Sequence, residues 1–290
     1  MKILIAADGS SHSHDAIALL KQLKVPADSE IVLLNVLEDF RAFAYESEIR
    51  DQVHEQLHER RKEEAVRLLD EIAEGFVPNG FCLRTEIREG HVADEITRLA
   101  EQEKADLVVV GSRGLSALDR FLSGSTSQKV LKHAPSSVLL SRPGDTSGEL
   151  LDASKDRLRI QLCWDGSPAC DEALATLTRL PLGQIADVRI VSVMSLMRTF
   201  RMDILQTMSE AWRSEQLATT EAVEKAAEHL RAAAYPNVMP LIREADDVSE
   251  DLLNVARGWH ADLIMIGSSG KSAIDRFLLG GRFAAWSSSF

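Results

Sequence analysis

The chain contains the same stretch twice. Residues 104–124 read KADLVVVGSRGLSALDRFLSG, and residues 260–280 read HADLIMIGSSGKSAIDRFLLG, at an offset of 156. The start repeats as well, because AADGS at 6–10 aligns with CWDGS at 163–167, at an offset of 157. A nearly constant offset indicates two copies of one unit of about 145 residues, which is a usual domain size. Any fold of this chain is therefore built twice from that unit.

The two copies are separated by turn-forming residues that include Pro143, Gly144 and Gly148. With 290 residues, 45% of them hydrophobic, the chain is long enough for two cores. The predicted boundaries are 1–143 for domain 1, 144–156 for a linker and 157–290 for domain 2.

Composition and charge exclude several classes of protein. No apolar run approaches the roughly 20 residues that span a bilayer, and the apolar start of the chain stops at Asp8, too early for a signal peptide. We therefore expect a cytoplasmic protein. The net charge of −12 and the lack of a clustered basic face argue against nucleic acid as the main partner.

Strand and helix patterns alternate along the first copy. Predicted strands are Lys2–Ala7, Ile31–Val36, 82–88, Leu107–Val110 and Ser137–Ser141, and predicted helices are 12–22, 46–76, 92–103 and 125–133. This alternation predicts an open, doubly wound parallel sheet with helices on both faces. If the strand order is 3-2-1-4-5, the ligand crevice lies beyond strands one and four, where Asp8 and Gly111 flank it.

The second copy repeats these strands with one exception. Predicted strands are 158–164, 187–193, 238–243 and Leu263–Ile266, with a long helix at 203–233. Adding the offset to Ser137–Ser141 puts a fifth strand at 293–297, beyond Phe290. The sequence therefore predicts that the second sheet lacks its fifth strand.

Glycines and hydroxyls follow the fourth strand of the first copy. Gly111 and Gly114 come first, and Gly124 then precedes Ser125 and Thr126 at a predicted helix start. Glycines let the backbone approach a polyanion, and a helix amino end offers unpaired N–H groups with partial positive charge. The pattern is typical of a phosphate site, although a glycine pair after a strand also occurs as a plain turn.

A first strand ending in Asp-Gly-Ser, followed by the late glycine and hydroxyl motif, resembles the universal stress protein family, here as a tandem of two domains. The resemblance implies an adenine-nucleotide-binding α/β fold, dimers, and ATP binding, with Mg²⁺ as a further possible cofactor, in members that keep the motif. It assigns Asp8 and Val36 to adenine, and Arg113 is added here as a cation able to reach phosphate. The complete set of predicted binding residues is Asp8, Val36, Gly111, Arg113, Gly114, Gly124, Ser125 and Thr126.

The second copy departs from the motif. Gly267, Gly270 and Gly280 keep the spacing, but Gly281 replaces the hydroxyl of Ser125. Losing one donor to a charged group costs about 1.5–3 kcal/mol. In addition, Trp164 replaces Ala7 beside the aspartate, where it either packs into the core or crowds the site. We expect the second site to be weak or empty.

Two further patterns point elsewhere. His54 and His58 form an H-E-x-x-H zinc pattern, but the segment is highly charged and has no third ligand, which favours a solvated helix. The cysteines, Cys82, Cys163 and Cys170, have no CxxC spacing, and we expect buried free thiols. No metal site and no catalytic residue is predicted.

Three functions remain open from the sequence. The first is a stress-response protein that binds ATP in domain 1 and acts through nucleotide-dependent partner interactions. The second is a dimerising interaction scaffold with vestigial pockets, and the third is a slow ATPase. Because strand Ser137–Ser141 is predicted to be an apolar edge, a homodimer through Ser137, Val138, Leu139, Leu140 and Ser141 is expected.

Overall fold

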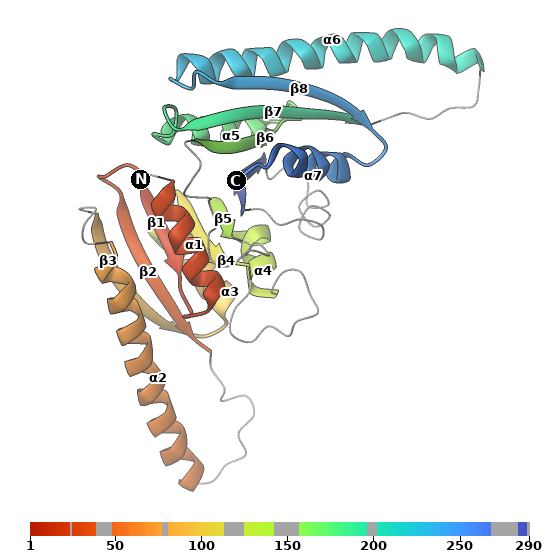
Figure 1. Cartoon of the computed structure of the whole chain (residues 1–290). Helices are drawn as coiled ribbons and strands as arrows, with labels where there is room; N and C mark the ends of the chain where they lie inside the picture. Colours follow the sequence, from red (N-terminus) through yellow and green to blue (C-terminus); the bar gives the residue numbers. More distant parts are fainter. Residues whose placement is uncertain are drawn as a thin grey trace. The chain divides into compact units, whose positions relative to one another are not determined.

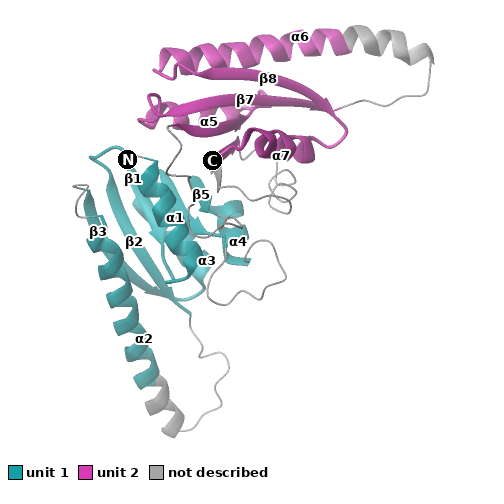
Figure 2. Ribbon diagram, in the orientation of Figure 1, with its two compact units in different colours: residues 1–143 teal, residues 144–290 magenta. Residues whose placement is uncertain are grey.

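The computed structural model divides the chain into two compact units, Met1–Pro143 and Gly144–Phe290 (Figure 2). The structure describes residues 1–23, 25–38, 48–76, 81–112, 125–141, 157–195, 202–267 and 284–288. The predicted linker lies outside these ranges. Among the described residues, no helix is both long enough and apolar enough to span a membrane.

Unit 1 alternates strands and helices as predicted (Figure 1). Its elements are β1 (Lys2–Ala6), α1 (Ser11–Gln22), β2 (Glu30–Leu37), α2 (Glu48–Glu74), β3 (Cys82–Glu89), α3 (Val92–Glu103), β4 (Leu107–Gly111), α4 (Ser125–His133) and β5 (Ser137–Ser141). All strand pairs are parallel, in the order β3-β2-β1-β4-β5. The predicted order is confirmed.

Helices cover both faces of this sheet. Helix α1 packs against β4 and β5 and α2 against β2 and β3, whereas α3 lies over β1, β2 and β3, and α4 over β5. Right-handed crossovers put the first two helices on one face and the last two on the other. The central strands are consequently buried on both sides, with Ile3, Leu4 and Ile5 fully inaccessible to solvent.

Unit 2 repeats the arrangement. Its elements are β6 (Leu158–Cys163), α5 (Pro168–Arg179), β7 (Ala186–Ser195), α6 (Met202–Ala232), β8 (Val238–Ala245), α7 (Val248–Trp259), β9 (Leu263–Gly267) and β10 (Ala284–Ser288). The strands run in the order β10-β9-β6-β7-β8, and every pair is parallel. The prediction of two doubly wound parallel sheets is confirmed.

Strand β10 corrects one prediction for unit 2. It pairs in parallel with β9, Ala284 opposite Leu263 and Ser288 opposite Gly267, where the sequence predicted no strand. The offset placed a fifth strand beyond the chain because it assumed equal connections. The connection 268–283 is shorter than its counterpart 112–136, so the chain reaches the sheet earlier.

Four charged side chains from β1, β2, β3 and α3 form a ring of ion pairs in unit 1. Lys2 Nζ lies 3.2 Å from Glu30 Oε2 and 3.0 Å from Glu103 Oε2. Arg84 lies 2.6 Å from Glu103 Oε1 and 3.8 Å from Glu30 Oε1. Hydrogen bonds from Lys2 and Arg84 hold the pKa of Glu103 below its ordinary value of 4.5. A network of this kind stabilises more than an isolated surface pair.

This network predicts a pH-dependent stability difference. A carboxyl whose pKa is depressed on folding contributes its full stability above its unfolded pKa, and loses it as the pH falls through the folded value. Glu103→Gln should therefore lower the unfolding free energy by about 1 kcal/mol at neutral pH, and by progressively less as the pH falls below about 4.5. Urea unfolding of both proteins across this range measures it, and a difference that stays constant to pH 3 contradicts it.

Candidate functional site

The site predicted for domain 1 lies at the carboxyl ends of β1 and β4. These strands are neighbours, with Ile5 opposite Val109, although the chain places three helices and two strands between them. Strand order reverses here, since β1 leads to β2 on one side and β4 leads to β5 on the other. In open parallel sheets this is the place where ligands bind.

The turn after β1 is built by Asp8, Gly9 and Ser10. Gly9 adopts φ +76°, which favours glycine. Asp8 Oδ1 accepts hydrogen bonds from Ser10 N at 3.0 Å and from Ser10 Oγ at 2.6 Å. Ser10 Oγ in turn accepts from Ser13 N at 3.2 Å, which caps α1. Asp8 therefore fixes the turn that leads from the carboxyl end of β1 into α1.

Gly111 ends β4 against the start of α1. A Cβ atom at this position would lie 2.7 Å from His12 C and 2.8 Å from Ser13 N, both backbone atoms. A side chain would force the helix away from the strand. Glycine is thus required by packing within the protein, in addition to the ligand contact predicted from the sequence.

Helix α4 begins at the same edge. Ser125 is exposed and Thr126 half-exposed, and the first turn contains no acidic residue. Ser127 Oγ donates to Ser112 O at 3.0 Å, which ties the start of α4 to the end of β4. Since N–H groups in a first helical turn have no acceptor within the helix, this end can receive an anion.

One positioning residue was missed by sequence reasoning. Asn35 Nδ2 donates to Ala7 O at 2.7 Å and so links β2 to the end of β1, beside the half-buried Val36. Its signal was a polar residue inside the apolar run EIVLLNVL. Ser127 follows Ser125 and Thr126 in the sequence motif, but its hydrogen bond to Ser112 O was not predicted.

The structure thus brings part of the predicted set to one edge. Asp8, Val36 and Gly111 end or follow neighbouring strands, and Ser125 with Thr126 begins α4. Three predicted residues lie outside the described part of the chain: Arg113, Gly114 and Gly124.

Unit 2 reproduces the turn and the close contact. Gly166 has φ +75°, and Asp165 Oδ1 accepts from Ser167 N at 2.9 Å. A Cβ at Gly267 would lie 2.7 Å from Ala169 C and 2.8 Å from Cys170 N. The duplicated sequence therefore folds with matching local geometry, even in its tightest contacts.

The side chains around the Asp165 turn differ from those around the Asp8 turn. Cys170 stands where domain 1 has Ser13, and its Sγ–H donates to Asp165 Oδ1 at 2.9 Å. Burial raises the pKa of Asp165, but hydrogen bonds from Cys170 and Ser167 outweigh it, and the pKa lies below 3.8. Trp164 is 8% exposed and packs into the core, the first of the two predicted outcomes. Gly270, Gly280 and Gly281 lie outside the described residues.

The cysteines divide into two kinds. Cys163 and Cys170 are buried free thiols as expected, whereas Cys82 is exposed, because it begins the edge strand β3. Burial raises the pKa of Cys163 to about 12, and burial together with Asp165 raises the pKa of Cys170 to about 11.

The pKa values of the cysteines predict which of them reacts with an alkylating agent, because the thiolate is the reactive form. Iodoacetamide at about pH 8 should therefore alkylate Cys82 alone in the folded protein, as read by peptide mass; equal labelling of Cys170 contradicts this.

The segment with the zinc pattern lies on α2. His58 Nε2 is 3.1 Å from Glu89 Oε1, and the side chain of His54 is outside the described part. Among the described residues, no three histidine, cysteine or acidic side chains are arranged to hold a metal.

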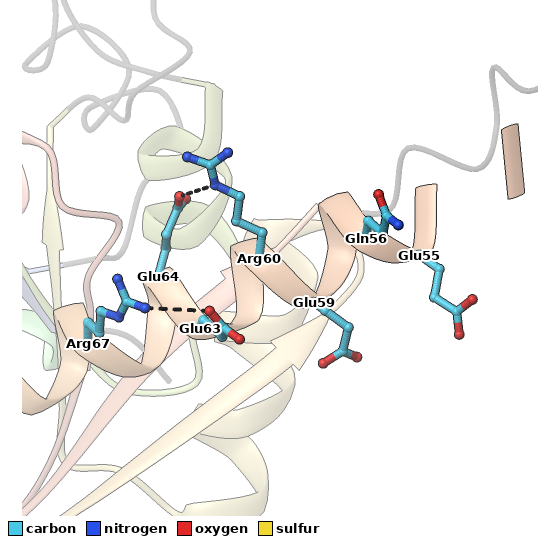
Figure 3. A pocket seen from close by; sticks show the side chains of 7 residues that line it. All are labelled: Glu55, Gln56, Glu59, Arg60, Glu63, Glu64 and Arg67. Carbon is cyan, nitrogen blue, oxygen red and sulfur yellow. Dashed lines mark hydrogen bonds and ion pairs between the residues drawn. The ribbon is translucent and has the colours of Figure 1, made fainter. Parts of the chain in front are cut away.

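A hollow on the surface of α2 is lined by seven side chains of this one helix, which Figure 3 shows together with the Arg60–Glu64 and Arg67–Glu63 pairs. A hollow without an opposing wall is a solvated helix face, and we assign no ligand to it.

Comparison with known proteins identifies the family. The model of the universal stress protein family matches twice, at residues 1–142 and 157–282. The chain belongs to the universal stress protein family. This confirms the resemblance predicted from the glycine motif and the Asp-Gly-Ser turn.

Relatives match either the whole tandem or one domain. A universal stress protein of Mycolicibacterium smegmatis is 28% identical over 285 residues, which is 96% of this chain and 90% of the relative. One from Thermus aquaticus is 34% identical over 141 residues, 48% of this chain and 97% of the relative. The crystal structure of a universal stress protein from Archaeoglobus fulgidus covers 99% of this chain and 97% of its own, with a TM-score of 0.63 at 19% identity, and shares the fold.

Proposed function

We propose that domain 1 binds an adenine nucleotide, ATP with Mg²⁺, and that the bound state changes interactions with partners in the cytoplasm. One observation carries the proposal: the Asp8 turn, the Gly111 end of β4 and the amino end of α4 lie at the point where the strand order of the sheet reverses. This edge combines a hydrogen-bonding carboxylate with the amino end of a helix, which suits a base at one end and phosphates at the other.

The described residues fit such a ligand. Asp8 and Val36 supply a polar and an apolar contact for adenine, and Ser125 and Thr126 supply hydroxyls for the phosphate tail or its metal. The proposal also includes Arg113, Gly114 and Gly124 as phosphate contacts. When bound, the metal would neutralise phosphate charge, and the chain's own part is to orient the nucleotide.

We propose that domain 2 binds nucleotide weakly or not at all. Trp164 packs into the core and does not block the site, whereas Asp165 Oδ1 accepts a hydrogen bond from Cys170 Sγ, which has no counterpart at Ser13 in domain 1. The substitution of Gly281 for the hydroxyl of Ser125 works in the same direction.

A direct experiment tests this function. Freshly purified protein is denatured, and the released small molecules are identified by mass. We expect an adenine nucleotide in the native protein and in Gly280→Asp, and its loss in Gly124→Asp. Equal loss in both variants contradicts the assignment to domain 1, and phosphate release above a no-protein control would favour a slow ATPase.

The homodimer through Ser137–Ser141 remains a separate proposal. The sequence favoured this interface because Ser137–Ser141 was predicted to be an apolar edge with no equivalent strand in domain 2, and the structure shows such a strand in β10. The side chains of Val138, Leu139 and Leu140 are also fully buried, so they offer a partner no apolar surface. Light scattering of the native protein decides the matter, because a monomer mass removes this interface.

A further inference from the structure

Unit 2 carries two arginines on one face of its sheet. Arg189 on β7 lies opposite Gln161 on β6, and Arg159 lies two residues before Gln161, so both arginines share a face. Gln161 Nε2 donates to Leu252 O, which shows that this face is the one covered by α7. The pair lies towards the amino-terminal part of these strands, whereas the nucleotide-type turn follows the carboxyl end of β6.

Trp259, the last residue of α7, contacts both arginines. The guanidinium carbon of Arg189 is 4.3 Å from the centre of the Trp259 ring. Arg159 Nη1 donates to Trp259 O at 3.0 Å. Within the described part of the chain, neither guanidinium forms an ion pair with a carboxylate.

In domain 1, the positive charge at the position that corresponds to Arg159 is neutralised by carboxylates. Arg159 aligns with Lys2, which is paired there with two carboxylates, Glu30 and Glu103. In unit 2 the counterpart of Glu103 is Trp259, which carries no charge.

Asp187, which aligns with Glu30, is paired with other residues of unit 2. Asp187 Oδ1 lies 2.5 Å from Arg157 Nε and accepts from Asn237 Nδ2 at 2.9 Å. Arg159 and Arg189 therefore lie on one face of the sheet beside Trp259, and among the described residues neither is paired with a carboxylate. Burial lowers the pKa of Arg189, and the nearby positive charge of Arg159 lowers it further.

We propose that Arg159 and Arg189, beside Trp259, form a binding site for a phosphate group. Two guanidinium groups match the charge of a phosphate dianion, and their planar forks match its oxygens. The site is separate from the nucleotide site proposed for domain 1 and does not depend on it. The phosphate could be free or carried by a larger molecule.

The test follows the indole N–H signals of uniformly ¹⁵N-labelled native protein by NMR. All four tryptophans, Trp164, Trp212, Trp259 and Trp286, lie in the second half of the chain, so phosphate bound in domain 1 is not read directly. Inorganic phosphate is titrated at constant ionic strength, with chloride as the balancing ion. Comparison with Trp259→Phe assigns the signal.

We expect the Trp259 signal to move saturably with phosphate and not with chloride alone. Arg189→Met should weaken this response at least about tenfold, because a charged hydrogen-bonding group is lost. The matched control is Arg243→Met, since Arg243 is already paired with Asp251 in the same unit. Arg189→Lys, which keeps the charge but loses the fork, should weaken binding less.

Two results overturn the proposal: a Trp259 signal that responds to chloride as it does to phosphate, and an unchanged phosphate response in both Arg189 variants. If Arg189→Met does not fold, Arg189→Lys and Arg159→Met carry the same test. A titration with O-phosphoserine distinguishes free phosphate from phosphate carried by a larger molecule. Tighter binding than inorganic phosphate indicates a phosphate carried by a larger molecule, and weaker binding indicates the free ion.

Discussion

Replacing Gly111 with alanine should destabilise domain 1 by about 3 kcal/mol and remove its nucleotide binding. The added Cβ would lie 2.7–2.8 Å from backbone atoms of His12 and Ser13. Backbone at a helix start cannot rotate away as a side chain can, so α1 must move from β4. Because the Asp8 turn leads into α1, this movement also displaces the proposed adenine contact. Urea unfolding and ATP binding measure the two effects.

Two glycines of unit 2 provide controls. Gly267→Ala produces the same contact against Ala169 and Cys170, and should destabilise that unit while leaving ATP binding unchanged. Gly258 lies inside α7, and an added Cβ there meets no atom within 4 Å. Gly258→Ala should stabilise by up to about 1 kcal/mol, as alanine favours helix. If Gly111→Ala binds ATP normally, the close packing of β4 on α1 is not needed for the site.

The second large effect is expected for Asp8→Ala. This change removes the acceptor for Ser10 N and Ser10 Oγ and the carboxylate proposed to contact adenine. A charged hydrogen-bonding group contributes about 1.5–3 kcal/mol, so ATP affinity should fall about ten- to a hundredfold. Isothermal titration calorimetry measures it.

Asp165→Ala is the matched control in domain 2. Asp165 accepts analogous hydrogen bonds from Ser167 and Cys170, so its removal should perturb local structure to a similar extent. We expect it to leave ATP affinity unchanged. Equal losses in the two variants would place nucleotide in both domains or in neither.

The duplicated sequence allowed most of the fold to be predicted. Apolar runs such as Leu107–Val110 predicted strands, because strands buried on both faces contain few polar residues. The fifth strand of unit 2 was missed for a physical reason. Ala284–Ser288 has no β-branched residue, and it pairs with β9 through backbone groups that a sequence pattern does not reveal.

The candidate site was predictable in part. The Asp8 turn and Gly111 are local patterns, and repetition in the second copy made them visible. Asn35 and the Arg159–Arg189 pair depend on strand register, which sets the neighbour of each side chain only once the sheet has formed. The packing requirement at Gly111 likewise depends on where α1 lies.

The most direct test of the nucleotide proposal is calorimetric titration of the native protein with ATP, with and without Mg²⁺. We predict saturable binding at one site per chain, strengthened by Mg²⁺. The absence of any measurable binding at millimolar ATP would contradict the proposed function.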